Sequence, residues 1–452
     1  MNSNRVEILN QRKNFAQNKG EYVLYWMQAA QRVKYNQALA YAIDVANKKK
    51  LPIKVFFNLA KTFKWGNNRN YRFMLEGIKE VKEILDKLKI PFYFYVGDFV
   101  KNIANFDKID TLVMDKGYIK EIEKFKNKVT QKFKKQEINI VEIDTNVVVP
   151  VKFASGKLEY AARTIRPKIL KNMDKFLEEV EIKKPVITET KIKTMLDTKT
   201  IDQLMEMCNI DSSIKPVKRF KGGQSQAIKR LNHFINNKLS KYNQNSPENI
   251  FSSQLSPYLH FGQISPVYIV RKLKKLNHQQ QKESFIEQLV VRRELAFNFV
   301  NFLENYDFFD SITYSWAYET MEKHKGDKRD HIYTRQDYID FNTHDKYFNA
   351  AMKEMIWTGY MHNYMRMYWG KKIIQWSKSY KEAYEIIKDL NNTYFLDGRD
   401  PISYASIAWL FGRHDRAWKE RKVFGKLRYM NSQGLERKFN MDKYLDFVEN
   451  LK

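Results

Sequence analysis

The sequence predicts an α/β domain followed by an all-helical domain, and three observations lead to this fold class. Short β-rich runs alternate with amphipathic stretches from about residue 20 to residue 150. From Gly222 onward the β pattern fades, and apolar residues recur at helical spacing. The chain has 452 residues, 43% of them hydrophobic and 14% aromatic, which is enough for two globular domains with sizeable cores.

The first domain is predicted to be a doubly wound parallel sheet. Strands alternating with amphipathic helices favour parallel strands joined by crossover helices. No G-x-G-x-x-G follows the first strand, so we expect the main redox cofactor elsewhere. The predicted strands are residues 22–26, 53–57, 92–96, 111–115 and 138–143, and the helices between them include 37–48 and 69–89.

Changes in composition divide the chain into three parts. Residues 1–180 form the sheet domain, and 181–217 are charged, interrupted by proline and predicted to connect the domains. Residues 218–452 form the helical domain.

The balance of charges favours a polyanionic partner. Lys and Arg number 80 against 52 Asp and Glu, a net charge of +28, which suits nucleic acid. A solvated, lysine-rich surface gives the same count, so charge alone does not separate the two interpretations. Cys208 is the single cysteine, which excludes a disulfide framework. The N-terminus lacks an apolar signal segment and no apolar run reaches 18 residues, so we expect a soluble, intracellular protein with no membrane partner.

The stretch 355–376 has the most unusual composition. After Gly359 it is predicted to be one helix, and Arg366, Trp369 and Trp376 fall on one face of it. Arginine is rarely buried unless it is paired, and a carboxylate follows at Asp397. An ordinary core helix filled with aromatic residues also fits this stretch.

Two further segments carry polar side chains at positions that suit ligand binding. Ser252, Ser253 and Ser256 precede a helix predicted to begin at Pro257, a position that suits an anion or simply an N-cap. Residues 285–299 form a predicted amphipathic helix that carries Glu287 and Glu294. Either carboxylate also fits a simple surface charge, neutralised by the neighbouring Arg292 and Arg293.

The remaining polar clusters are assigned more simply. His344 and Asp345 have no further His or Cys at the spacing of a metal site, so we expect a helix entry and no metal. Near the end of the chain, a basic tract interleaved with aromatic residues suits a DNA backbone, although a solvated tail has the same composition. Its basic residues are Arg413, Arg416, Arg421, Lys422, Lys426 and Arg428.

Several of these motifs together resemble class II cyclobutane pyrimidine dimer photolyases. The resemblance covers nearly the whole chain and is most specific in the flavin-binding half. The motifs that carry it are residues 25–27, 31–33, 159–168, 255–262, 365–369, 372–376, 394–401 and 414–418.

The resemblance implies a light-dependent DNA repair enzyme. In this family, photoexcited reduced FAD passes an electron to a flipped-out dimer, whose cyclobutane bonds then split. The resemblance implies that the FAD lies against Tyr242, Ser252, Ser253, Leu255, Ser256, Arg366, Asn391, Asp397 and Asp400. The sheet domain is expected to hold an antenna chromophore of the deazaflavin or folate type.

The same resemblance assigns roles at the dimer. Glu287 is expected to hydrogen-bond the damaged base, with a pKa raised by desolvation, and Asn391 to face flavin N5. Trp369 and Trp376 are expected to relay electrons to the flavin. The residues expected to bind the dimer or the DNA are Tyr333, Met367, Trp409, Arg416 and Arg428.

The chain departs from the family pattern in three places. Val291 and Phe348 stand where relatives carry tryptophan, and the turn 409–414 is one residue shorter. The expected partner is UV-damaged DNA, single- or double-stranded, with no obligate protein partner and a monomeric state. In a prokaryote we expect a cytoplasmic, nucleoid-associated protein. Two alternatives remain: a cryptochrome-like FAD photoreceptor without repair activity, and a basic nucleic-acid-binding protein without a cofactor.

Overall fold

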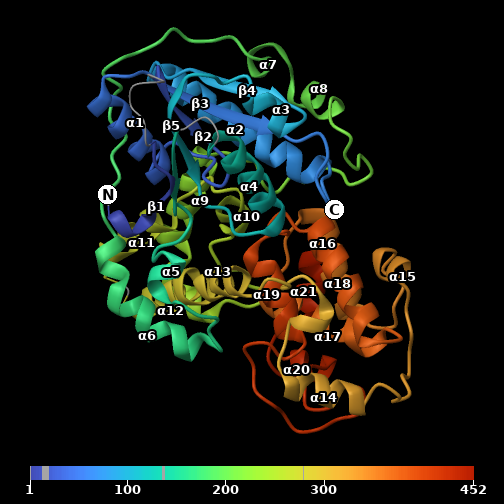
Figure 1. Ribbon diagram of the computed structural model, residues 1–452. Coiled ribbons are helices and arrows are strands. Elements are labelled where there is room, and N and C mark those ends of the chain that lie inside the picture. Colours follow the sequence, from blue (N-terminus) through green and yellow to red (C-terminus); the bar gives the residue numbers. More distant parts are fainter. Residues whose placement is uncertain (1, 13–19, 135–137, 278, 452) are drawn as a thin grey trace.

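The structure is a computed structural model that describes residues 2–12, 20–134, 138–277 and 279–451. A six-stranded sheet forms one half of the molecule and a group of helices forms the other (Figure 1). The strand order is β1-β6-β5-β2-β3-β4, in which β1 is antiparallel to β6 and the other pairs are parallel. The strands are β1 Val6–Asn10, β2 Tyr22–Trp26, β3 Ile53–Leu59, β4 Phe92–Val96, β5 Ile109–Asp115 and β6 Asn139–Ile143.

Helices cover both faces of this sheet, which explains why its central strands are almost wholly apolar. In β2, Val23 and Tyr25 pack into the core beneath α1 Gln37–Lys49 and α2 Asn68–Lys87. The alternate residues Leu24 and Trp26 pack into the opposite core, with α3 Phe99–Ile103 and α4 Lys120–Lys134. A parallel sheet covered on both faces is the doubly wound arrangement that the sequence predicts.

The chain leaves the sheet through two helices and then returns to it. After α5 Val151–Ala154 and α6 Ala162–Asn172, a long segment passes around the sheet to α7 Met195–Thr198 and α8 Ile201–Glu206 (Figure 1). Leu196, Leu204 and Met205 from this segment belong to the same core as α2. The connection predicted at 181–217 therefore contains helices that pack against the sheet half.

The rest of the chain is helical, and its longest helices carry the motifs noted in the sequence. One hydrophobic core of this half combines α16, α17, α18 and α19, which carry many of the predicted site residues. The helices are α9 Gln224–Asn237, α10 Ser256–His260, α11 Pro266–Lys274, α12 Gln279–Ile286, α13 Arg293–Phe302, α14 Ser315–Lys323, α15 Arg335–Ile339, α16 Lys346–Thr358, α17 Asn363–Trp376, α18 Tyr380–Tyr394, α19 Pro401–Leu410, α20 Ser432–Glu436 and α21 Met441–Glu449.

Buried arginines join the two halves. Arg32, from the sheet half, is fully buried. It donates to the carbonyl oxygen of Thr145 at 2.9 Å and to that of Gly262, in the helical half, at 2.8 Å. Gly262 has φ +64°, and a Cβ there would lie 1.8 Å from the carbonyl oxygen of Ala29, so only glycine permits this close approach. Arg69 on α2 is bonded in the same way to carbonyls of the helical half.

The fold class is confirmed, with two local differences from the predicted elements. Strand β1 was not predicted, because it is a half-exposed edge strand with a weak apolar pattern. The predicted helix 285–299 is interrupted by a π-helix at Glu287–Arg292 between α12 and α13. Among the described residues, no helix is both long and apolar enough to cross a membrane.

Candidate active site

The predicted pair Arg366–Asp397 is formed. Nη2 of Arg366 lies 3.0 Å from Oδ2 of Asp397, and Nε donates to the carbonyl oxygen of Met361 at 3.1 Å. The guanidinium carbon lies 3.8 Å from the ring centroid of Phe395. Arg366 keeps 24% of its side chain exposed and Asp397 keeps 11%, so the pair is oriented on several sides but not closed off.

A tight turn between α18 and α19 presents Asp397. A Cβ on Gly398 would lie 2.7 Å from the carbonyl oxygen of Asn391, so a larger residue does not fit. Arg399 adopts φ +62°, and its backbone N–H donates to Oδ1 of Asn392 at 2.8 Å. Asn391 is buried and donates its Nδ2 to the same Oδ1 at 3.0 Å. The turn thus folds back against the end of α18, which carries Asn391.

The serine-rich segment approaches this region through Tyr360. Oγ of Ser252 lies 3.0 Å from the hydroxyl oxygen of Tyr360, and the Arg366 guanidinium carbon lies 5.8 Å from the Tyr360 ring centroid. Ser253 accepts the backbone N–H of the buried Leu255 at 3.4 Å. Ser256 is the first residue of α10, one position before the predicted start of that helix.

Tyr242 lies in the 3₁₀ helix Leu239–Gln244 and packs edge-on against Phe285, with ring centroids 5.4 Å apart. Burial, and then the nearby Tyr360, raise the pKa of Tyr242 to about 12. The tyrosine is therefore neutral at physiological pH and offers an apolar ring with a polar edge.

Several buried polar atoms around these segments have no hydrogen-bond partner among the described residues. Buried polar groups are nearly always paired, so unmet donors and acceptors on facing segments are typical of a site that takes a polar ligand. These atoms are Nη1 of Arg219, Nε2 of Gln254, Oε1 of Glu354, Nδ2 of Asn392 and Oδ1 of Asp397. Arg219 lies over the Tyr360 ring, and Gln254 stands between the predicted serines.

Aromatic side chains connect α16 and α17. Trp376 is buried, with its ring centroid 5.2 Å from that of Phe348 and 5.5 Å from that of Tyr333. Nε1 of Trp369 lies 2.9 Å from the sulfur of Met352, one helical turn beyond Phe348 on α16. Phe348 and Met352 therefore stand between the two predicted relay tryptophans, and Tyr333 lies beside Trp376.

Asp345 begins α16. Its Oδ1 accepts the backbone N–H groups of Tyr347 and Phe348, both at 3.0 Å, so the predicted helix-entry role is confirmed. His344 accepts or shares a hydrogen bond with the Tyr333 hydroxyl, 2.8 Å away. Among the described residues, no group of three or more His, Cys, Asp or Glu side chains is placed to hold a metal ion.

Glu287 is paired on two sides. Arg166, on α6, makes a bidentate contact, with Nε 2.9 Å from Oε2 and Nη2 2.7 Å from Oε1. Nε of Arg292 lies 3.1 Å from Oε1. Partial burial alone raises the pKa of Glu287, but Arg166 and then Arg292 outweigh this effect, and the pKa is lowered. The raised pKa expected from the sequence is therefore wrong, because the expectation did not include Arg166.

Glu294 was the second predicted carboxylate of this region, and it faces the opposite way. It is buried, and its two oxygens accept the backbone N–H groups of Val148 and Val149. Glu294 therefore joins α13 to the end of the sheet half, away from Glu287.

The C-terminal basic tract forms an alternating stack. The guanidinium carbon of Arg428 lies 4.1 Å from the Trp418 ring centroid and 5.3 Å from that of Trp409, and Arg416 lies 4.9 Å from that of Trp418. Arg428 is held by Asp415, with contacts of 2.9 and 3.1 Å.

The other members of the basic tract separate into two groups. Arg416, Arg421, Lys422 and Lys426 are exposed. Arg413 is buried and lies over the rings of Phe299 and Tyr314, so its predicted place on the basic surface is wrong. Met367, on α17, is half-buried.

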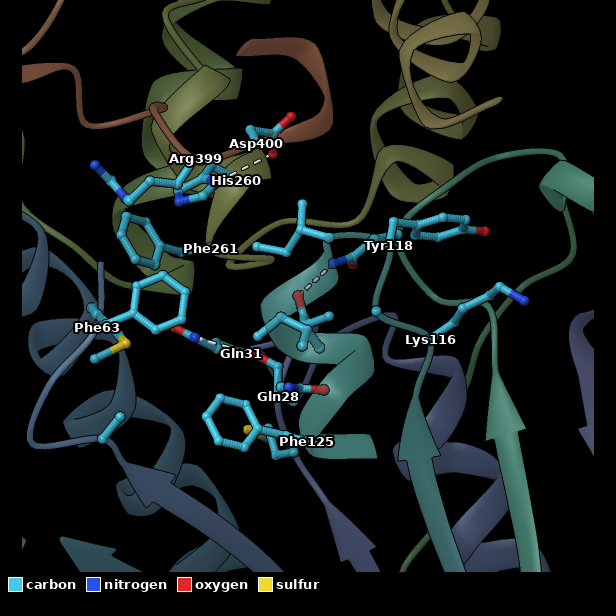
Figure 2. A pocket seen from close by; sticks show the side chains of 18 of the residues that line it. Gln28, Gln31, Phe63, Lys116, Tyr118, Phe125, His260, Phe261, Arg399 and Asp400 are labelled. Atoms are coloured by element: carbon cyan, nitrogen blue, oxygen red, sulfur yellow. Dashed lines mark hydrogen bonds and ion pairs between the residues drawn. The ribbon is translucent and has the colours of Figure 1, made fainter. Parts of the chain in front are cut away.

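A separate cavity of about 250 Å³ lies where the carboxyl ends of the parallel strands meet the helical half (Figure 2). Gln28, Lys116 and Phe125 line it from the sheet half, and His260 and Phe261 from α10 and the turn after it. Asp400, predicted to bind the flavin, borders this cavity, caps α19 through the Ile402 N–H and lies 3.1 Å from Nδ1 of His260. The sequence led us to expect a chromophore in the sheet domain but assigned none of the lining residues except Asp400 to a ligand, although ligands of doubly wound sheets commonly bind at the carboxyl ends of the strands.

The doubly wound sheet, the helical half and the cavity between them define a two-part protein with the photolyase fold. Residues 23–186 match the family model described as DNA photolyase. A class III photolyase from Agrobacterium tumefaciens has a similar structure, with a TM-score of 0.72 and 16% identity over 96% of this chain and 88% of that one. An archaeal photolyase from Sulfolobus tokodaii, determined with two FAD molecules, gives a TM-score of 0.69 at 16% identity over 94% of this chain and 89% of that one.

Similarity in sequence extends over almost the whole chain. The deoxyribodipyrimidine photo-lyase of Methanothermobacter thermautotrophicus is 38% identical, over 96% of this chain and 96% of its own length. The enzyme of the same name from Arabidopsis thaliana is 38% identical over 95% of this chain and 89% of its own length. That from Potorous tridactylus is 36% identical over 98% of this chain and 84% of its own length. The chain belongs to the DNA photolyase family.

Proposed function

We propose that this protein is a class II cyclobutane pyrimidine dimer photolyase, which repairs UV-damaged DNA in a light-dependent reaction. The observation that carries the proposal is the likeness, over nearly full length, to several proteins named deoxyribodipyrimidine photo-lyase. The oriented Arg366–Asp397 pair, with an unmet acceptor on Asp397, supports a bound polar cofactor at the position that the family resemblance assigns to FAD.

The residues around Tyr360 suit FAD. Arg366 and Asp397 would hold the edge of the flavin ring, with Asn391 near N5, and the unmet donors of Arg219 and Gln254 suit phosphate oxygens. When bound and reduced, FAD supplies on illumination the electron that opens the dimer and takes it back afterwards. The protein contributes position, the exclusion of water and fixed charges.

The dimer would bind next to the proposed flavin position after leaving the base stack, as in other enzymes that act on a flipped base. Glu287, Met367 and Trp409 are the proposed wall residues, and Arg416 and Arg428 the proposed DNA contacts. The stacking of Arg428 between Trp409 and Trp418 supports this assignment, because flipped bases stack on such rings. Tyr333 lies beside Trp376, so we place it at the aromatic relay of Trp369 and Trp376 and not at the dimer.

We propose that the cavity in Figure 2 takes an antenna pigment of the deazaflavin or folate type. Its aromatic lining, from Phe63, Phe125 and Phe261, suits a planar conjugated molecule, and Gln28 and Lys116 offer polar groups at its edge. A pigment extracted from purified protein that absorbs apart from FAD would support this assignment. Protein that retains FAD as its only chromophore after purification from a pigment-producing host would contradict it.

We propose that residues 1–180 form a sheet domain, 181–217 a connection and 218–452 the catalytic domain. The expected partner is damaged DNA, the expected state a monomer without an obligate protein partner, and the expected location in a prokaryote the cytoplasm.

A repair assay in light and in darkness tests the function. Purified protein should release FAD on heating and should restore dimer-containing DNA only when illuminated. Flavin without repair would favour the cryptochrome-like photoreceptor, and colourless protein would favour a DNA-binding protein without a cofactor.

Glu287→Ala tests the site. This variant should retain FAD but should lower the repair yield per absorbed photon by about tenfold, the effect of losing one charged hydrogen bond of about 1.5 kcal/mol. Glu283→Ala, one helical turn earlier on α12, is the matched control. An unchanged yield in Glu287→Ala would remove Glu287 from the site.

A further inference from the structure

Arg166 is the side chain that most strongly constrains Glu287. Arg166 lies on α6, at the end of the sheet half, and makes a bidentate contact with Glu287, 121 residues later in the sequence. The π-helix Glu287–Arg292 sets the direction of Glu287 and brings Arg292 to the same carboxylate. Such π segments within helices occur frequently at functional sites.

The three contacts leave part of the carboxylate free. A carboxylate has about four acceptor positions on its two oxygens, and Arg166 and Arg292 fill three of them. The open position is on Oε2, and Glu287 keeps 24% of its side chain exposed. One further donor can therefore reach Glu287 without displacing either arginine.

Charge distinguishes this cluster from an isolated glutamate. Two guanidiniums and one carboxylate carry a net charge of +1. A single carboxylate facing the dimer would oppose the arrival of an electron on the base, because like charges repel strongly in a partly desolvated site. Arg166 removes that repulsion.

We propose that Arg166 is a positioning residue of the dimer site: it holds Glu287 as a charge-compensated acceptor, so that the wall facing the dimer stays net positive when the base gains an electron. This inference rests on the proposed role of Glu287 in repair. The open acceptor position of Oε2 suits the imide N–H of a pyrimidine, and the remaining donors of Arg292 suit a pyrimidine carbonyl. Glu287 thus acts as an acceptor, and its pKa is lowered instead of raised as the sequence suggested.

The test compares repair yield per absorbed photon in protein whose FAD has been chemically reduced. Arg166→Gln leaves the charge of Glu287 uncompensated and should lower the yield several-fold with unchanged flavin content. Arg166→Lys keeps the charge and should recover part of the yield. Arg163→Gln is the matched control, because Arg163 is exposed on the same helix.

A double variant separates charge compensation from a structural role. Arg166→Gln combined with Glu287→Gln removes both charges and should repair better than Arg166→Gln alone. The yield of Arg166→Gln should also rise as the pH falls through the ordinary range of a carboxyl group, while the wild-type yield stays level. Arg166 on α6 and Arg292 on the π-helix are the charged groups that hold the pKa of Glu287 down, so removing one raises it.

The outcomes separate the role of Arg166, the placement of Glu287 at the dimer and the proposed repair function. A double variant no better than Arg166→Gln, or an Arg166→Gln variant that repairs like the wild type, would overturn the role of Arg166. If Glu287→Ala also repairs normally, the error lies in placing Glu287 at the dimer. If no variant and no wild-type sample repairs DNA in light, the proposed function itself fails.

Discussion

Replacing Arg69 should loosen the contact between the two halves of the molecule. Arg69 is 5% exposed at the start of α2, and its guanidinium donates to four backbone carbonyls. Those of Tyr394 and Ile356 lie 2.5 Å away, and those of Lys215 and Met355 lie 3.2 and 3.3 Å away. Three of them end α16 or α18, where a positive charge is favourable to the helix dipole.

The expected loss follows from these contacts. A hydrogen bond to a charged group contributes about 1.5–3 kcal/mol, but the cost of burying the guanidinium offsets much of the sum. Burial lowers the pKa of Arg69 to about 10, so the side chain is still charged at neutral pH. Arg69→Ala leaves buried carbonyls unpaired and should lower the free energy of unfolding by about 3–5 kcal/mol.

Urea unfolding followed by tryptophan fluorescence measures this loss, and flavin release measures its effect on the site. Because Tyr394 directly precedes Phe395, which lies under Arg366, the variant should also release FAD at a lower urea concentration. Arg72→Ala is the control: Arg72 lies on the same helix in a partly exposed pair with Asp202, and its loss should cost at most about 1 kcal/mol. A loss below about 1 kcal/mol in Arg69→Ala would refute the reasoning.

Three further predictions concern pH, photoreduction and DNA. Burial raises the pKa of Glu294 to about 8, so between roughly pH 4.5 and 8 this side chain holds a proton in the folded chain that it has lost in the unfolded chain. Its contribution to the free energy of unfolding should fall as pH rises across this window, so the wild type should lose more stability over the window than Glu294→Gln does. Phe348→Trp should speed the photoreduction of oxidised FAD, because phenylalanine is harder to oxidise than tryptophan; equal rates in absorbance measurements under blue light would mean that another aromatic residue completes the path. DNA affinity should fall steeply with salt. Arg428→Ala should weaken binding to damaged DNA more than to undamaged DNA, whereas equal losses in a binding titration would assign Arg428 to the DNA backbone.

The sequence predicts the sheet well because its strands and helices have strong local patterns. Strands β2 to β6 and helices α1 and α2 lie within a few residues of their predicted positions. Strand β1 was missed because burial at a sheet edge leaves a weak pattern: Ile8, at its centre, is 63% exposed. Local periodicity thus predicts the strands that carry buried apolar residues, including the edge strand β4, and fails for β1, none of whose residues is buried.

Side-chain partners from distant segments are harder to predict. The net charge of +28 suggested a DNA-binding surface, but Arg5, Arg32, Arg69, Arg293 and Arg399 are all buried. Arg5 alone donates to four carbonyls, from Asp144 to Phe176. No local pattern marks an arginine that is paired with remote carbonyl oxygens, because its acceptors are common to every residue type. The net charge therefore measures the DNA-binding surface only after these internal arginines are set aside.

Glu287 and Glu294 show how far three-dimensional context separates two similar residues. They stand seven positions apart, a spacing that places both on one face of a regular helix. The π-helix between them changes that register: Glu287 turns toward Arg166 and solvent, and Glu294 turns into the core toward the amides of Val148 and Val149. Their pKa values consequently shift in opposite directions, downward for Glu287 and upward to about 8 for Glu294. Glu294 is therefore one of the groups that couple folding to pH near neutrality, and Glu287 is the one of the two with a free acceptor position.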